Sequence, residues 1–131
     1  GVIWAGVVAS YPDMLYNWRR SSTVTPSPSS RGIGWRRRWI SEYGTPEQNP
    51  DFWNAISSTS YLADLSGPLQ LHHGTADEDV PMEFSIRLAE QARAAGKIAD
   101  LYLYDGDNHN ISNNFDLAMK QTIEFFDQYL K

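Results

Sequence analysis

Residues 69–81 read Leu69-Gln70-Leu71-His72-His73-Gly74-Thr75-Ala76-Asp77-Glu78-Asp79-Val80-Pro81, and this stretch decides the fold. Its first five residues form a short run with leucines at positions 69 and 71, which Gly67-Pro68 introduces and Gly74 ends, a pattern typical of a core β-strand. A polar turn with three acidic residues follows directly. The stretch therefore predicts a buried strand over 69–73 that delivers acidic side chains to its carboxyl end.

The chain continues as an alternation of helix and strand. Pro81 suits a first helical turn and Gly96 suits a left-handed C-terminal cap, which predicts a helix between them. A further strand is predicted over Leu101–Tyr104, and a final helix follows Asn113 and Asn114 as candidate N-caps. Helical spacing relates Phe84, Leu88, Ala92 and Ala95 in the first helix, and Phe115, Ala118, Thr122, Phe125, Phe126 and Tyr129 in the second. This alternation predicts a parallel α/β sheet with right-handed crossovers.

The residues before this unit contain one more strand and an irregular segment. Residues 2–10 are a near-continuous apolar run, as expected for a strand covered on both faces, and the chain enters it without a lead-in. We therefore expect the chain to be a piece of a longer domain. Residues 11–67 do not follow this alternation and are predicted to be a helical insertion over the edge of the loops that follow the strands, with helices over 34–43 and from Pro50. Residues 21–30 are expected to be its most mobile part.

Composition narrows the class of protein. The 131 residues carry a formal net charge of -5, 41% hydrophobic residues and no cysteine. The acidic balance argues against a wholesale binder of nucleic acid or of anionic membranes. The lack of cysteine excludes disulfide scaffolds, thiolate metal sites and a cysteine nucleophile. No apolar run reaches transmembrane length.

Two polar side chains are candidates for chemistry. Asp77 follows the strand over 69–73, and His109 follows the strand over 101–104. The carboxyl ends of neighbouring parallel strands meet at one edge of the sheet, where open α/β sheets place their sites. A carboxylate that holds one imidazole nitrogen makes the other a general base. We therefore expect a carboxylate oxygen of Asp77 within roughly 2.6 to 3.2 Å of a ring nitrogen of His109.

These motifs resemble the α/β-hydrolase superfamily, and most closely its prolyl oligopeptidase-like branch. The pattern His-Gly-x-x-Asp-x-x-Val-Pro matches His73 to Pro81, and Tyr-x-Gly-x-x-His matches Tyr104 to His109. The resemblance implies that Asp77 is the acid and His109 the base of a Ser-His-Asp triad. It covers residues 60–131 clearly and residues 1–10 more weakly. The fold class it implies is the C-terminal portion of an α/β-hydrolase, with about three parallel strands and flanking helices.

The nucleophile is the large departure from this family. No Gly-x-Ser-x-Gly elbow occurs in the sequence, and neither Ser10, Ser57 nor Ser66 has flanking glycines. In the family the elbow and the oxyanion-hole donors precede the strand that residues 2–10 resemble. We therefore predict a serine peptidase or esterase segment that is inactive alone and needs the upstream half of the same domain. Its partners would be a peptide or ester substrate and that upstream half, or a self-associated copy, with no nucleic acid, membrane, metal or cofactor.

Several alternatives stay open from the sequence. Asp79 competes with Asp77 for the role of acid, although it also suits a turn or a helix cap. His72 and His73 point to opposite faces of a strand, so packing roles are favoured over a shared metal ion. A basic and aromatic stretch could contact nucleic acid or could be a solvated helix face; it contains Trp18, Arg19, Arg20, Arg31, Trp35, Arg36, Arg37, Arg38 and Trp39. A non-catalytic binding module derived from the same fold is the alternative to the enzyme.

Overall fold

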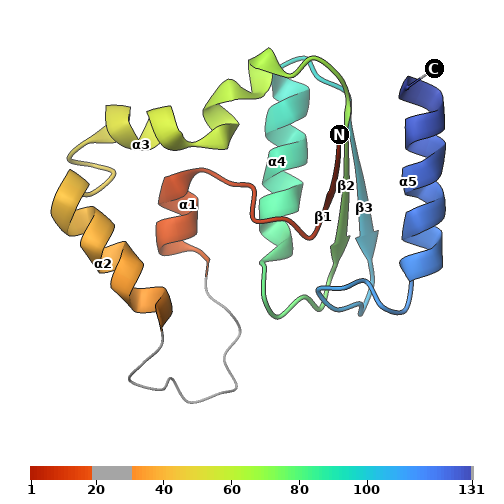
Figure 1. Cartoon of the computed structure of the whole chain (residues 1–131), viewed down its shortest axis with the longest axis horizontal. Coiled ribbons are helices and arrows are strands. Elements are labelled where there is room, and N and C mark those ends of the chain that lie inside the picture. Colours follow the sequence, from red (N-terminus) through yellow and green to blue (C-terminus); the bar gives the residue numbers. More distant parts are fainter. Residues whose placement is uncertain (19–30, 131) are drawn as a thin grey trace.

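The computed structural model describes residues 1–18 and 31–130, and it is built around one parallel sheet (Figure 1). Its strands are β1 (Val2–Trp4), β2 (Leu69–Gly74) and β3 (Ala99–Tyr104), in the order β1-β2-β3. Helix α4 (Met82–Ala94) covers one face of the sheet and α5 (Phe115–Tyr129) covers the other. The predicted fold class of three parallel strands with flanking helices is confirmed.

Strand β1 is shorter than the predicted strand over residues 2–10. It pairs with β2 only through Val2, Ile3 and Trp4. The backbone then turns at Ala5, whose φ of 44° lies in the left-handed region that interrupts an extended strand. The prediction over residues 5–10 was therefore wrong, because an apolar run cannot by itself distinguish a strand from a packed loop.

The crossover from β2 through α4 to β3 follows the prediction closely. The buried face of α4 contains Phe84, Leu88 and Ala92. Gly96 ends the helix with a φ of +77°. The amide of Lys97 donates to the carbonyl of Ala92, and that of Gly96 to Arg93, which is the Schellman arrangement. This crossover holds β2 and β3 in register as neighbours.

Helix α5 buries only part of its apolar surface. Ala118 and Phe125 are buried as predicted, and Ala118 packs near Tyr104. Phe115 is 47% exposed and Phe126 is 39% exposed, so the predicted stripe is only half covered. Leu117, Met119 and Ile123 are exposed as well. Together, Phe115, Met119, Ile123 and Phe126, which share one side of the helix, are called the uncovered α5 face below.

The segment between β1 and β2 contains the remaining helices. These are α1 (Tyr11–Tyr16), α2 (Arg31–Tyr43), α3 (Pro50–Ile56) and the 3-10 helix η1 (Ser58–Asp64). Gly44 ends α2 with a φ of +79° and Pro50 begins α3, as predicted; α1 and η1 were not anticipated. The division of the chain at residues 11–67 stays a prediction.

Aromatic packing holds α1, α2 and α3 together. Trp53 is fully buried, and Trp39 stacks on Tyr11 with ring centroids 5.5 Å apart. Arg36 lies over Trp35 and donates to the carbonyls of Met14 and Trp18. These contacts favour an internal packing role for this part of the basic and aromatic stretch. Arg19 and Arg20 lie outside the described residues.

The first part of this segment is linked to the loop that carries Asp77 and to α4. The indole Nε1 of Trp18 donates to the carbonyl of Asp79 at 2.9 Å, and Asp13 pairs with Arg87 of α4 at 2.7 Å. Helices α2 and α3 lie farther from the sheet, beyond α1 (Figure 1). The expectation that residues 21–30 are the most mobile falls on residues that the structure does not describe. None of the described helices is both long and apolar enough to cross a membrane.

A buried polar network lies between the sheet and α5. His72 is fully buried; its Nδ1 is 2.7 Å from the hydroxyl of Tyr104, and its Nε2 is 2.8 Å from Oε1 of Gln70. The Tyr104 hydroxyl donates to Oε1 of Gln121 at 2.6 Å. Burial lowers the pKa of His72 to about 4 and raises the pKa of Tyr104 to about 12. Both groups are therefore neutral at pH 7, so the network carries no net charge.

This network predicts a pH dependence of stability. The unfolded chain takes up a proton on His72 near pH 6.5, while the folded chain resists it until about pH 4. The free energy of unfolding should therefore fall as pH decreases from 6.5 to 4, by on the order of 2 to 3 kcal/mol. Urea denaturation across this range checks it. His72→Gln should remove that part of the slope, and an unchanged slope in this variant would contradict the assignment.

Candidate active site

The sheet brings the two candidate loops to one edge. Strands β2 and β3 are parallel and end side by side, with Gly74 paired to Tyr104. The loop from β2 to α4 carries Asp77, and the loop from β3 to α5 carries His109. Both loops lie below the strand tips in Figure 1. Residues 32 positions apart in the chain therefore meet without any contribution from α2 or α3.

The carboxylate of Asp77 is buried and surrounded by N–H groups. Its side chain is 1% exposed, and its Oδ1 accepts from the amides of Asp79 at 2.8 Å and Val80 at 2.9 Å. Burial acts to raise the pKa of Asp77, but the donors from Val80, His109 and Asp79 outweigh it and hold the pKa below its usual value. The group is therefore ionised at neutral pH.

His109 meets the other oxygen of this carboxylate. Its Nδ1 lies 2.8 Å from Oδ2 of Asp77, which confirms the predicted distance. An ionised carboxylate can only accept, so Nδ1 carries a proton, and in the neutral imidazole Nε2 then holds the lone pair. The imidazole is 37% exposed, and within residues 1–18 and 31–130 its Nε2 has no hydrogen-bond partner. This is the tautomer that a general base needs.

Asp79 does not occupy this position. Its backbone amide donates to Oδ1 of Asp77, and its carbonyl accepts from the indole of Trp18. The ion pair with His109 is formed by Asp77 instead. The geometric choice of Asp77 over Asp79 is confirmed, and the catalytic role of the pair stays a prediction.

Asp107 shapes the loop that carries His109, and the sequence analysis missed it. This side chain is fully buried and accepts from the amides of Asn108, Asn113 and Asn114 and from the side-chain amide of Asn114, at 3.0 to 3.1 Å. Burial acts to raise the pKa of Asp107, but these donors lower it overall. The only signal in the sequence was an aspartate among asparagines just before a helix, which also fits an ordinary turn.

Gly74 lets the two loops touch. A Cβ atom at this position would overlap the backbone carbonyl oxygens of Asp107 and Asn108. The amide of Ala76 donates to the carbonyl of Asp107 at 2.9 Å, and the amide of Gly106 donates to the hydroxyl of Thr75 at 2.8 Å. The glycine of the His-Gly-x-x-Asp pattern is therefore required by a close approach of backbones.

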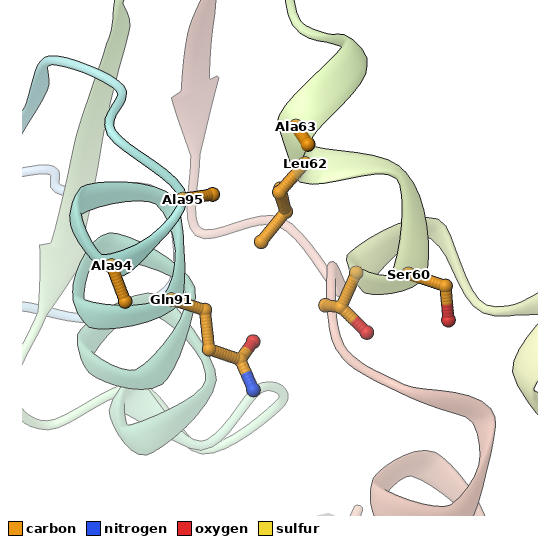
Figure 2. Close-up of a pocket in the computed structure, with 7 residues that line it drawn as sticks. Ser60, Leu62, Ala63, Gln91, Ala94 and Ala95 are labelled. Carbon is orange, nitrogen blue, oxygen red and sulfur yellow. The ribbon is translucent and has the colours of Figure 1, made fainter.

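One hollow of the described surface is remote from this pair. A cavity of about 320 Å³ lies between η1 and the C-terminal half of α4, and Figure 2 shows Leu62 and Gln91 directed toward it from the two elements. Neither candidate loop contributes to its lining. Within the described ranges, no group of three or more His, Asp or Glu side chains is placed to hold a metal ion.

The sequence model of the prolyl oligopeptidase family matches residues 2–131. The chain belongs to the prolyl oligopeptidase family. Its fold is that of an α/β-hydrolase, with the three described strands in one open parallel sheet.

Solved structures agree on the fold. An acylaminoacyl peptidase of Pyrococcus horikoshii superposes with a TM-score of 0.68 at 21% identity, over 97% of this chain and 19% of that protein. A Bacteroides ovatus protein assigned as a dipeptidyl aminopeptidase IV gives a TM-score of 0.57 at 21% identity, over 73% of this chain and 13% of that one. Dipeptidyl peptidase 4 of Porphyromonas gingivalis gives 0.50 at 24% identity, over 64% and 12%. The chain therefore spans less than a fifth of the length of these relatives.

The contact at Gly74 gives a prediction about the site. Gly74→Ala should lower the free energy of unfolding by roughly 1 to 3 kcal/mol, because the added methyl forces the two loops apart. The same shift should lengthen the contact between His109 and Asp77. Denaturant unfolding, with the histidine resonances followed by NMR, measures both effects.

Gly67→Ala is the matched control, since a Cβ there has no atom within 4 Å. Equal losses of unfolding free energy in the two variants would show that the close approach of the backbones at Gly74 is not the cause of the effect.

Proposed function

We propose that this chain supplies the acid and the base of a serine hydrolase that cleaves an acyl bond, in a peptide or an ester. His109 acts first as base and then as acid, and Asp77 orients it. The serine nucleophile and the oxyanion-hole donors come from residues outside these 131. The observation that carries the proposal is the 2.8 Å contact between Nδ1 of His109 and the buried carboxylate of Asp77.

The geometry suits each proton transfer. Nε2 of His109 takes the proton of the serine hydroxyl as the serine oxygen attacks the carbonyl carbon. Asp77 stabilises the imidazolium that forms, because its charge lies beside Nδ1. The imidazolium then gives the proton to the leaving nitrogen or oxygen as the acyl bond breaks. A water molecule repeats the sequence on the acyl-enzyme and regenerates the serine.

Two features support a nucleophile from outside the chain. The sequence contains no Gly-x-Ser-x-Gly elbow, and no serine in the described part is hydrogen-bonded to His109. Strand β1 pairs with β2 on one side and has no partner strand on the other in the described sheet. An open parallel edge and the uncovered α5 face both suit continuation by the upstream part of such a domain. A second copy of the chain is the other candidate for these surfaces.

The substrate class rests on the family. The prolyl oligopeptidase family and the peptidases named above favour a peptide, and the site residues themselves serve peptide and ester alike. Acyl transfer by this triad uses no metal or organic cofactor, so none is proposed.

A non-catalytic binding module is the second candidate, and the uncovered α5 face favours it. Phe115 and Ile123 are 47% and 55% exposed on one helix, and large exposed apolar surfaces often mark interaction sites. The module and the enzyme differ in one respect, which is whether a serine is placed at Nε2 of His109.

An active-site probe distinguishes the two candidates. The 131-residue chain alone should show neither labelling by a fluorophosphonate nor ester turnover above background, because it lacks the elbow serine. The product of the complete reading frame, or a mixture of this chain with the upstream segment, should show both. Labelling of the isolated chain that His109→Ala abolishes would overturn the assignment of the nucleophile. A complete product that never labels would favour the binding module.

The role of the acid is tested in the active form. Asp77→Asn should lower kcat by about 10⁴-fold, because an amide can donate to Nδ1 and stabilise the wrong tautomer. Asp79→Asn should cost less than about 10-fold, since the substitution keeps the backbone hydrogen bonds of Asp79 to Asp77 and Trp18, and His109 pairs with Asp77. Steady-state kinetics on both variants measure the difference. A larger loss in Asp79→Asn would transfer the role of acid to that residue.

A further inference from the structure

His73 is a fully buried histidine whose two ring nitrogens both have partners. Its Nδ1 lies 2.7 Å from the hydroxyl of Ser85, in the first turns of α4. Its Nε2 lies 3.0 Å from the carbonyl oxygen of Val80 and 3.1 Å from Oδ2 of Asp77. The sequence analysis gave this residue only a packing role, and its contact with the carboxylate of Asp77 is a finding of the structure.

The partners of His73 fix its tautomer. A carbonyl oxygen can only accept, so the hydrogen bond to Val80 places the ring proton on Nε2. Nδ1 then holds a lone pair and accepts from the hydroxyl of Ser85, which is free to rotate toward it. The proton on Nε2 therefore faces both Val80 and Oδ2 of Asp77. A neutral imidazole thus brings an N–H dipole to the charged carboxylate without adding a buried charge.

We propose that His73, held by Ser85, is a positioning residue that keeps the carboxylate of Asp77 turned toward His109. This inference rests on the proposed function, since it concerns the same reaction. His73 does not touch the substrate or the serine, and it acts through Asp77 alone.

The four groups around Asp77 show why such a residue is needed. Oδ1 is held by two backbone amides of its own loop, at Asp79 and Val80. Oδ2 faces His109, which is partly exposed, and His73, which is not. The same Nε2–H that faces Oδ2 also binds the carbonyl of Val80, so one imidazole holds both the carboxylate and the end of its loop. Without it, Oδ2 keeps only the solvent-exposed one of these two partners.

The carboxylate of Asp77 and the polar groups that face it form a small cluster. The carboxylate of Asp77 is faced by His73 from β2 and by His109 from the loop after β3. Ser85 is the polar side chain that α4 presents to this cluster. The insertion reaches the same loop through Trp18, which donates to the carbonyl of Asp79. Among the described ion pairs, Asp77 is thus the one carboxylate that pairs with His73 or His109.

The first test needs no variant. In protein labelled with ¹⁵N-histidine, the nitrogen chemical shifts at neutral pH report which ring nitrogen carries the proton. We expect His73 as the Nε2–H tautomer and His109 as the Nδ1–H tautomer. A His73 protonated on Nδ1 alone would place no N–H toward Asp77 and would overturn the proposal. This result does not depend on whether the serine probe labels the protein.

Two variants of His73 then separate positioning from packing. His73→Leu removes the N–H and keeps an apolar side chain, whereas the amide nitrogen of His73→Gln can replace Nε2–H. His109 should lose its Nδ1–H tautomer preference in the leucine variant and keep it in the glutamine variant. His72→Leu is the matched control, because His72 is the adjacent buried histidine on the opposite face and does not touch Asp77. Equal effects of all three on His109, or no effect of His73→Leu, would overturn the proposal.

Kinetics of the active form give an independent readout. His73→Leu should lower kcat by roughly 10²-fold with little change in KM, the effect of a misplaced catalytic group, and His73→Gln should restore most of that loss. A loss that appears in KM, or that glutamine does not restore, would show a merely structural role. If the complete protein has no activity at all, the proposed function fails, while the tautomer measurements still decide the positioning role.

Discussion

The contact between the ends of β2 and β3 is the constraint on which the site depends. Gly74 lies against the carbonyls of Asp107 and Asn108 so closely that no side chain fits. Hydrogen bonds from Thr75 to Tyr104 and from Ala76 to Asp107 continue the sheet pairing into the loops. Asp77 is one residue beyond Ala76, and His109 is two residues beyond Asp107. Their separation is therefore set by backbone packing, which is more rigid than a contact between free side chains.

The two adjacent histidines of β2, His72 and His73, make contacts on opposite faces of the sheet. His72 faces α5 and joins Tyr104 and Gln121 in a neutral network. His73 faces α4 and lies between Ser85 and Asp77. Strand geometry dictates this division, because successive side chains point to opposite faces. One imidazole therefore connects the sheet to a helix, and the next connects the same strand to the acid of the site.

The sequence predicted what depends on short patterns and missed what depends on contacts between loops. The helix between Pro81 and Gly96 and the meeting of Asp77 with His109 followed from turn chemistry and from the topology of parallel strands. The end of β1 at Trp4 did not, since the left-handed φ of Ala5 is not favoured by alanine itself and comes from tertiary packing. Asp107 and His73 have the composition of ordinary turn and strand residues. Their roles appear only when their partners from another loop or helix are placed beside them.

The contacts that hold Asp77 and His109 differ from the exposed apolar surfaces in what they require from the rest of the domain. In the part of the chain that the structure describes, the Asp77 carboxylate is contacted by His73, His109 and the amides of Asp79 and Val80, and Trp18 adds a hydrogen bond to the carbonyl of Asp79 in the same loop. The uncovered α5 face and the free edge of β1 are different, because apolar area and unpaired backbone groups gain stability only when something covers them. A partner that supplies the serine would therefore be recruited by apolar burial and strand pairing at sites separate from the catalytic pair. Under the proposed function, the geometry of proton transfer is therefore preorganised locally, and its completion depends on association.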